Sequence, residues 1–205
     1  MLDYVSDDPS IREVILYSDD PLIVPDERLN SLVAKIEDIP HLKRLRIHTR
    51  LPVVIPQRIT ERLIEILVNT HSNSVVIAHF NHLNEIDENV AVAFTSLNQT
   101  GITLLNQSVL LAGVNDNVAT LRGLSEALFE VGILPYYLRL PDRVTGTSHF
   151  HVGIDTAVRL HNGIQSSLPG YLVPKLVHDK PGLPAKELIT SHSFALTSAQ
   201  RDALE

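Results

Sequence analysis

Hydrophobic residues along this chain fall into two alternating patterns. Short, nearly continuous apolar runs, which are typical of strands buried on both faces, alternate with longer stretches in which apolar residues recur at helical spacing. The expected strands are residues 12–18, 42–48, 74–80, 102–111, 133–140 and 171–179, and the expected helices are residues 25–39, 59–71, 87–101, 115–132 and 152–168. Strict alternation of strand and helix predicts a parallel sheet with the helices packed outside it.

The number of these elements predicts the fold class. Five strand–helix units and a terminal strand fit in the 205 residues, whereas a complete eight-stranded barrel takes about 250 residues. We therefore expect an α/β fold that forms a partial (β/α) barrel. Because no linker or repeat interrupts the pattern, we expect a single domain over residues 1–205, with its core over residues 11–150.

A few local signals mark helix ends. Thr60 is expected to cap the helix over residues 59–71, and Gly101 and Gly132 are expected to end two others. Gly163 is an interior glycine that weakens the helix over residues 152–168. Each signal makes a local prediction that a structure can test.

Polar residues gather directly after the expected strands. They are Asp19, Asp20, His48, Thr49, Arg50, His79, Asn81, His82, Asn106, Gln107, Asp142 and Arg143. The carboxyl ends of parallel strands meet at one edge of a sheet, where α/β folds bind ligands. Gly113 and Asn115 are instead expected to form a turn and to cap the next helix. The expected functional site therefore lies at the edge formed by the strand ends.

Composition and charge narrow the function classes. The formal net charge is -7 and no basic stripe is present, so nucleic acid is not an expected partner. No apolar run approaches the ~18 residues of a membrane span, and the acidic N-terminus does not resemble a secretory signal. We therefore expect no membrane partner and a cytoplasmic location. The chain has no cysteine, which excludes disulfides, a cysteine nucleophile, and zinc or iron–sulfur sites held by its own thiolates.

Two groups of residues could carry chemistry, and each has two interpretations. His79, His82 and Glu85 follow a strand and could form a divalent-metal site like those of barrel hydrolases, but loop histidines that hydrogen-bond and cap the following helix explain the same pattern. Lys186 follows a turn predicted over residues 181–184, and it is either a Schiff-base lysine or an ordinary solvated one.

Asp142 and Asp179 are single acids that follow strands. Either carboxylate could bind an ammonium group, or it could serve as a turn or capping residue. The sequence has no GxGxxG, GxxxxGK[ST] or GxSxG pattern, so residues 113–117 are not expected to form a phosphate-binding loop.

Five segments together resemble the lysine 2,3-aminomutase family. They are HLKRLRIHTRLPVVIPQRIT (residues 41–60), AHFNHLNEID (78–87), LLNQSVLLAGVNDN (104–117), LPYYLRLPDRVTG followed by HF (134–150) and PGYLVPKLVHDKPGLPAK (169–186). The resemblance extends over nearly the whole chain, and it favours the branch that makes (R)-β-lysine for the modification of elongation factor P. It implies a radical S-adenosylmethionine enzyme on a partial barrel, which uses a [4Fe-4S] cluster, S-adenosylmethionine and pyridoxal 5′-phosphate to convert L-lysine to β-lysine.

The resemblance also implies roles for particular residues. Lys186, in a C-terminal segment over residues 169–190, matches the lysine that holds pyridoxal phosphate. Asp142 and Asp179 match the two acids that hold the ε-ammonium of the substrate lysine. With this assignment no metal site is expected at His79 and His82.

A second set of residues matches positions that contact S-adenosylmethionine. His79 and Gln107 are implied to contact it, and Asp20 keeps the acid of a Gly-Gly-Asp motif whose two glycines are replaced here by Ser18 and Asp19. The cysteine motif CxxxCxxC, which follows the first barrel strand in the family, has no counterpart. We therefore expect a truncated barrel that lacks its first strand–helix unit and is inactive alone. Whether this chain is an isomerase, as the resemblance implies for the family, stays open.

Three alternatives accompany this interpretation. The chain could be the C-terminal half of a split aminomutase, with an N-terminal half or a second copy covering the open edge of its first strand. It could be a remnant that binds pyridoxal phosphate or lysine through Lys186, Asp142 and Asp179. A metal-dependent hydrolase that uses His79 and His82 is the remote alternative.

Overall fold

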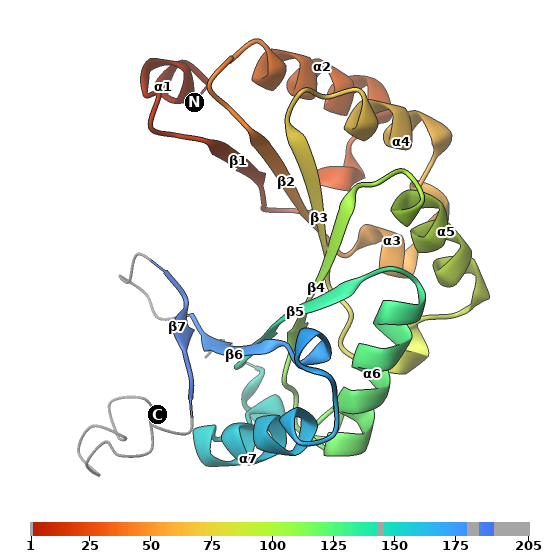
Figure 1. The fold of residues 1–205 in the computed structure, drawn as a ribbon, viewed down its shortest axis with the longest axis vertical. Helices are drawn as coiled ribbons and strands as arrows, with labels where there is room; N and C mark the ends of the chain where they lie inside the picture. Colours follow the sequence, from red (N-terminus) through yellow and green to blue (C-terminus); the bar gives the residue numbers. More distant parts are fainter. Residues whose placement is uncertain (1, 143–145, 180–184, 191–205) are drawn as a thin grey trace. The chain divides into compact units, whose positions relative to one another are not determined.

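The computed structural model describes residues 2–142, 146–179 and 185–190. These residues form seven strands in one sheet, ordered β1 to β7 as in the sequence (Figure 1). The pairs β1–β2, β2–β3, β3–β4 and β5–β6 are parallel, whereas β6 and β7 are antiparallel. The predicted alternation of parallel strands and helices is confirmed.

Each expected element overlaps an observed one. The strands are β1 (Glu13–Leu16), β2 (Arg44–Thr49), β3 (Asn73–Ala78), β4 (Thr103–Val109), β5 (Leu134–Arg139), β6 (Lys175–His178) and β7 (Glu187–Leu188). The α-helices are α1 (Leu2–Asp7), α2 (Asp26–Glu37), α3 (Leu51–Val54), α4 (Glu61–Val68), α5 (Glu88–Asn98), α6 (Val118–Glu130) and α7 (Ile154–Gln165). Short 3-10 helices are η1 (Pro21–Ile23), η2 (Pro56–Arg58), η3 (Leu83–Glu85), η4 (Ser148–Phe150) and η5 (Gly170–Leu172).

The differences from the sequence prediction have local causes. The strand expected over residues 171–179 begins only at Lys175, because η5 occupies the residues before it. Helices α1 and α3 and strand β7 were not predicted, since each is too short to show a period. The predicted turn over residues 181–184, Arg143 and the segment beyond residue 190 lie outside the described residues.

The chain divides into two compact units. The first consists of Met1–Phe80, Asn84–Asn106 and Glu130–Ile133, and the second consists of Asn81–Leu83, Gln107–Phe129 and Leu134–Glu205. Strand β4 begins in the first unit and ends in the second. Whether the two units form a single domain, as expected from the sequence, stays a prediction.

The core of the first unit forms where apolar faces of its helices meet strands. Helix α2 buries Leu29, Val33 and Ile36, which share one helical face, and strand β2 buries Leu45 and Ile47. Each such side chain contributes about 1.5–3 kcal/mol relative to its exposure.

The helix ends predicted at Thr60, Gly101 and Gly132 are confirmed. The Thr60 hydroxyl accepts a hydrogen bond from the Leu63 N–H at the start of α4. Gly101 and Gly132 have φ angles of 82°, a conformation that glycine adopts without strain.

No helix in the described part of the chain is long and apolar enough to cross a bilayer.

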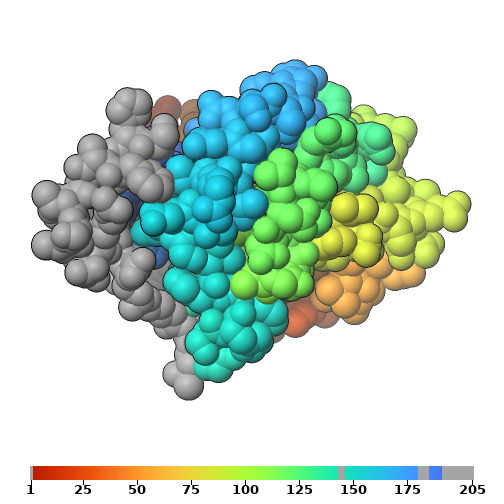
Figure 2. Space-filling model, turned by 90° about the horizontal axis from the view of Figure 1, so that it is seen from below, coloured from red at the N-terminus to blue at the C-terminus, as the bar shows by residue number. Residues whose placement is uncertain are grey.

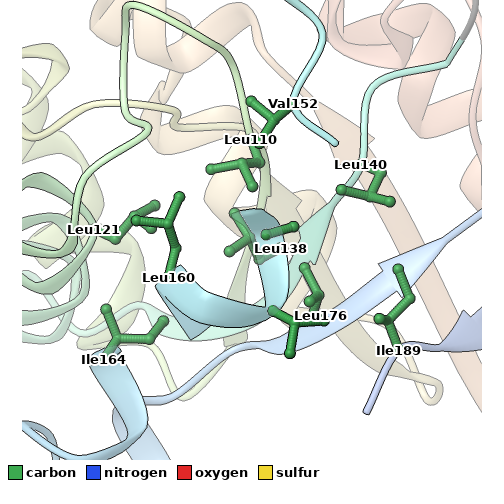
Figure 3. Packing of buried hydrophobic residues seen from close by; sticks show 11 residues of the cluster. Leu110, Leu121, Leu138, Leu140, Val152, Leu160, Ile164, Leu176 and Ile189 are labelled. Atoms are coloured by element: carbon green, nitrogen blue, oxygen red, sulfur yellow. The ribbon is translucent and has the colours of Figure 1, made fainter. Parts of the chain in front are cut away.

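The core of the second unit lies between strands β5 and β6 and helices α6 and α7 (Figure 3). Its buried residues are Leu110, Leu121, Leu138, Leu140, Val152, Ala157, Val158, Leu160, Ile164, Leu176 and Ile189. The two helices run beside each other on the face shown in Figure 2. Because alternate residues of a strand point to opposite faces, burying Leu138 and Leu176 here turns Arg139 and Val177 to the other face.

Gly163 explains how α6 and α7 approach so closely. A Cβ atom added at Gly163 would lie 2.5 Å from Val118 Cγ2. The glycine that weakens α7 by its helix propensity therefore makes room for the first residue of α6.

We expect Gly163→Ala to destabilise the protein by about 1–3 kcal/mol, although alanine is the better helix former, because the new methyl group overpacks the contact with Val118. The measurement is the free energy of unfolding in urea. Gly153→Ala, whose Cβ would meet nothing within 4 Å, is the matched control. In a Val118→Ala background the cost of Gly163→Ala should fall by at least half, and an unchanged cost there would contradict the explanation.

Candidate functional sites at the strand ends

A turn with unusual backbone angles follows β1 in the first unit. Ser18, Asp19 and Asp20 have φ angles of 114°, 46° and 54°. Each residue with a side chain in this region costs about 1–2 kcal/mol relative to an extended or helical conformation. Three in succession make this turn a strained segment that other contacts must hold in place.

The carboxylate of Asp20 supplies those contacts. It accepts hydrogen bonds from the Thr49 hydroxyl (2.6 Å) and from the backbone N–H groups of Arg50 (2.6 Å) and Leu51 (2.8 Å). It also accepts one from the N–H of Leu22 (3.2 Å). Asp20 therefore caps α3 and η1 together, and its predicted contact with S-adenosylmethionine stays a prediction.

A pocket of about 460 Å³ opens beside this turn. His48 Nδ1 lies 3.3 Å from His79 Nε2, and the Tyr17 ring meets the His48 ring edge-on at 5.2 Å. The pocket is lined by Tyr17, Ser18, Asp19, Asp20, His48, Thr49, Arg50 and His79. Two of the predicted cofactor-binding residues, Asp20 and His79, thus share one pocket, whereas His48 and Tyr17 were not assigned roles.

The hydrolase alternative needs a group of side chains that can hold a metal ion. In residues 2–142, 146–179 and 185–190, no group of three histidine, aspartate or glutamate side chains is arranged to hold a metal ion. Asp87 caps helix α5 by accepting a hydrogen bond from the Val90 N–H, so the helix start after His82 and Glu85 has its own cap.

Two buried amide side chains lie within β4, which continues to Val109 and so extends past the strand end expected near Asn106 and Gln107. In the first unit, Asn106 Oδ1 accepts from the Phe80 N–H (2.8 Å) and Asn106 Nδ2 donates to the Phe80 carbonyl (3.1 Å). In the second unit, Gln107 is buried and its Oε1 has no hydrogen-bond partner. A donor on a bound ligand could satisfy this oxygen, and the binding role of Gln107 stays a prediction.

The prediction that Asn115 caps α6 is wrong. Asn117 caps that helix by accepting from the Thr120 N–H. Asn115 is fully buried, and it donates to the carbonyls of Asn81 (2.8 Å) and Val109 (2.9 Å). A buried amide that ties backbone groups of separate segments is a tertiary contact, which a local capping pattern cannot show.

The pairing of β6 with β7 brings Lys186 to Asp179 in the second unit. The antiparallel register sets Val177 opposite Leu188 and His178 opposite Glu187, so the next pair outward is Asp179 with Lys186. The two side chains form an ion pair. Lys186 is 26% exposed and Asp179 is 42% exposed.

Arg139, the last residue of β5, joins the two predicted acids. Its Nη2 lies 3.0 Å from Asp142 Oδ2 and 3.2 Å from Asp179 Oδ2. The arginine side chain is only 11% exposed, and its buried Nε has no hydrogen-bond partner. Sequence analysis did not single out Arg139; the available signal was an arginine that ends an otherwise apolar strand three residues before a candidate acid.

These contacts shift the titration of Asp179. The hydrogen bond from Lys186, with the charges of Lys186, Arg139 and His178, lowers the pKa of the Asp179 carboxyl below its ordinary value of 3.8, although burial opposes the shift. Since the folded-state pKa is depressed, the stabilisation is fully present above pH 3.8 and is lost as the pH falls through the lower value. The acid is therefore ionised at neutral pH.

Comparison with solved structures confirms the fold. The crystal structure of Streptococcus suis SuiB bound to S-adenosylmethionine matches with a TM-score of 0.60 at 15% identity, over 82% of this chain and 39% of that one. A radical SAM methyltransferase from Sphaerobacter thermophilus matches with a TM-score of 0.51 at 13% identity, over 75% of this chain and 48% of that one. The predicted α/β partial-barrel fold is thus confirmed.

Comparison of sequences identifies the relatives. The chain is 51% identical over 187 residues to L-lysine 2,3-aminomutase of Haemophilus influenzae and 47% identical over 185 residues to that of Escherichia coli. The chain is a homologue of the lysine 2,3-aminomutases. The alignments cover 91% and 90% of this chain but 55% and 54% of the relatives, so the chain spans about half the length of the curated relatives it matches. No model of a protein family matches it.

The residues of this aminomutase homologue fit one of the expected cofactors but not another. No cysteine occurs in the 205 residues, so they offer no thiolate for a [4Fe-4S] cluster and do not fit that group. Lys186 is a partly exposed primary amine next to a carboxylate, and it fits the attachment of pyridoxal phosphate. In the first unit, Ser18 and Asp19 stand where the family resemblance implies glycines, and the backbone retains positive φ there.

We expect Ser18→Gly to stabilise this homologue by about 0.5–1 kcal/mol. Relief of strain at positive φ outweighs the extra freedom that glycine gives the unfolded chain. Unfolding in urea measures the change, and Ser18→Ala is the control because it retains Cβ and should give no gain. Equal stabilities for the glycine and alanine variants would contradict the assignment of strain.

Proposed function

We propose that this chain is an aminomutase homologue of the elongation-factor-P branch that binds pyridoxal phosphate and the ε-ammonium of L-lysine in its second unit. One observation carries the proposal. The structure brings Lys186, Asp179 and Asp142, which the sequence predicted separately, into one cluster through Arg139. A primary amine paired with one of two carboxylates that share an arginine is suited to an aldehyde cofactor and a cationic ligand.

The chain's own residues would divide the work as follows. Pyridoxal phosphate, when bound, supplies an aldehyde that condenses with an amine and a ring that withdraws electrons from the bound amino acid. Lys186 provides the amine, and the β6–β7 pairing fixes its position. Asp142 and Asp179 accept hydrogen bonds from a ligand ammonium and select for its charge.

The proposal assigns no radical step to these 205 residues. The family's rearrangement needs an electron from a cysteine-held cluster, and the sequence contains no cysteine. The carboxylate of Asp20 is also engaged by the hydroxyl of Thr49 and by three backbone N–H groups. We therefore expect the purified chain alone to form no β-lysine.

The decisive test is the attachment of pyridoxal phosphate. Incubation of the protein with the cofactor should produce an absorbance band of the lysine adduct, and borohydride reduction should fix the cofactor to Lys186 in a peptide map. Lys186→Ala should lose the band, whereas Lys175→Ala, which removes an exposed lysine of β6, should keep it. A band of equal strength in the Lys186→Ala protein would contradict the proposal.

A second candidate function is participation in a split enzyme. In the described residues β1 has a strand neighbour on one side only, and Ile15 and Tyr17 are 45% and 63% exposed. A groove of about 550 Å³ beside them is lined by apolar residues of β1 and α2 together with polar residues such as Arg28 and Lys35. A further strand–helix unit would cover this edge, because an unpaired apolar edge strand tends to recruit another chain.

The split-enzyme candidate predicts association with an N-terminal partner. Co-expression with the N-terminal half of the E. coli relative should yield a complex that carries iron and forms β-lysine, whereas the chain alone should do neither. Ile15→Lys should prevent the complex without unfolding the chain, since the side chain is exposed. Separate elution of the two polypeptides on a sizing column would rule the candidate out.

A further inference from the structure

Charges of both signs meet in the acid cluster of the second unit. Asp142 and Asp179 bring two negative charges, and Arg139 and Lys186 bring two positive ones. A ligand ammonium that enters this cluster must compete with cations of the chain for the same carboxylates.

The two resident cations differ in how firmly they are held. Arg139 contacts both acids through one nitrogen and is 11% exposed. Among the described residues, the ion pair of Lys186 is with Asp179; its side chain is 26% exposed, and it precedes a strand of two residues. A flexible ammonium with one partner is displaced at lower cost than a guanidinium held by two.

We propose that a ligand ammonium binds Asp179 by displacing the ammonium of Lys186, while Arg139 stays in place and sets the strength of that binding. Arg139 is thus a specificity-determining residue of this chain. It reduces the negative charge that the ligand meets from two to one, and so limits the preference for a cationic over a neutral side chain. This inference rests on the proposed function, because it names the ligand of the same site.

Ligand binding and the position of Lys186 are coupled, because both involve the carboxylate of Asp179. Any change that removes Lys186 from Asp179 should strengthen ligand binding there, and a bound ligand should in turn release Lys186. Attachment of a cofactor to Lys186 would therefore open the ammonium subsite. The order of events would be cofactor first, ligand second.

Four proteins test the proposal without any cofactor: the wild type, Lys186→Met, Arg139→Gln and the double variant. Titration calorimetry or NMR measures the affinity of each for L-lysine and for L-norleucine, which has the same side chain without the ammonium. The ratio of the two affinities should rise about three- to tenfold for each cation removed and should be highest in the double variant. Norleucine binding should stay constant.

Two controls separate charge from folding. Arg139→Lys retains the charge and should keep the ratio close to that of its parent, whereas Arg159→Gln removes an exposed charge of α7 and should change nothing. Circular dichroism confirms that each variant is folded. A ratio that is unchanged between Lys186→Met and the double variant would overturn the proposal, as would the absence of lysine binding in all four proteins.

The outcome is distinguishable from failure of the proposed function. Suppose that the wild type forms the pyridoxal phosphate adduct but the ratio of the affinities for lysine and norleucine does not change when Arg139 is replaced. Then only the inference about Arg139 fails. If no adduct forms while the ratio responds to both cations, the ammonium subsite stands and the cofactor assignment fails.

Discussion

The antiparallel pairing of β6 with β7 is the constraint on which the chemistry of the second unit depends. A parallel sheet ends its strands at one edge, and a chain returning antiparallel brings a later residue back to that edge. Here the register alone sets Lys186 opposite Asp179. The neighbouring parallel pair of β5 with β6 then brings Arg139 within reach of the same carboxylate. Two hydrogen-bond ladders thus assemble the cluster.

Much of the fold could be predicted because its strands and helices are long enough to show a period. Each predicted helix and strand overlaps an observed one, and the carboxyl ends of the strands carry the polar residues that line both candidate sites. Residues 51–54 and 187–188 escaped prediction because each segment is too short to show a period. Helix α3 depends on the carboxylate of Asp20, and β7 depends on β6.

The sequence predicted which residues belong to the candidate site better than it predicted the contacts between them. Lys186, Asp179 and Asp142 were each expected to act, but no local pattern shows that an arginine joins the two acids. Asn115 was predicted as a helix cap and is a buried tertiary anchor instead. Polar residues at strand ends therefore divide between ligand binding and support of the backbone, and only the structure shows which of the two tasks a side chain already performs.

The turn after β1 has a consequence for how the first unit moves. Three successive residues with side chains at positive φ store energy that local opening would release, so this turn should be among the first segments to separate from the sheet in the native state. Asp20 holds the start of α3, so opening at the turn would also release that helix. Positive φ angles at three residues with side chains therefore lower the local stability of the first unit.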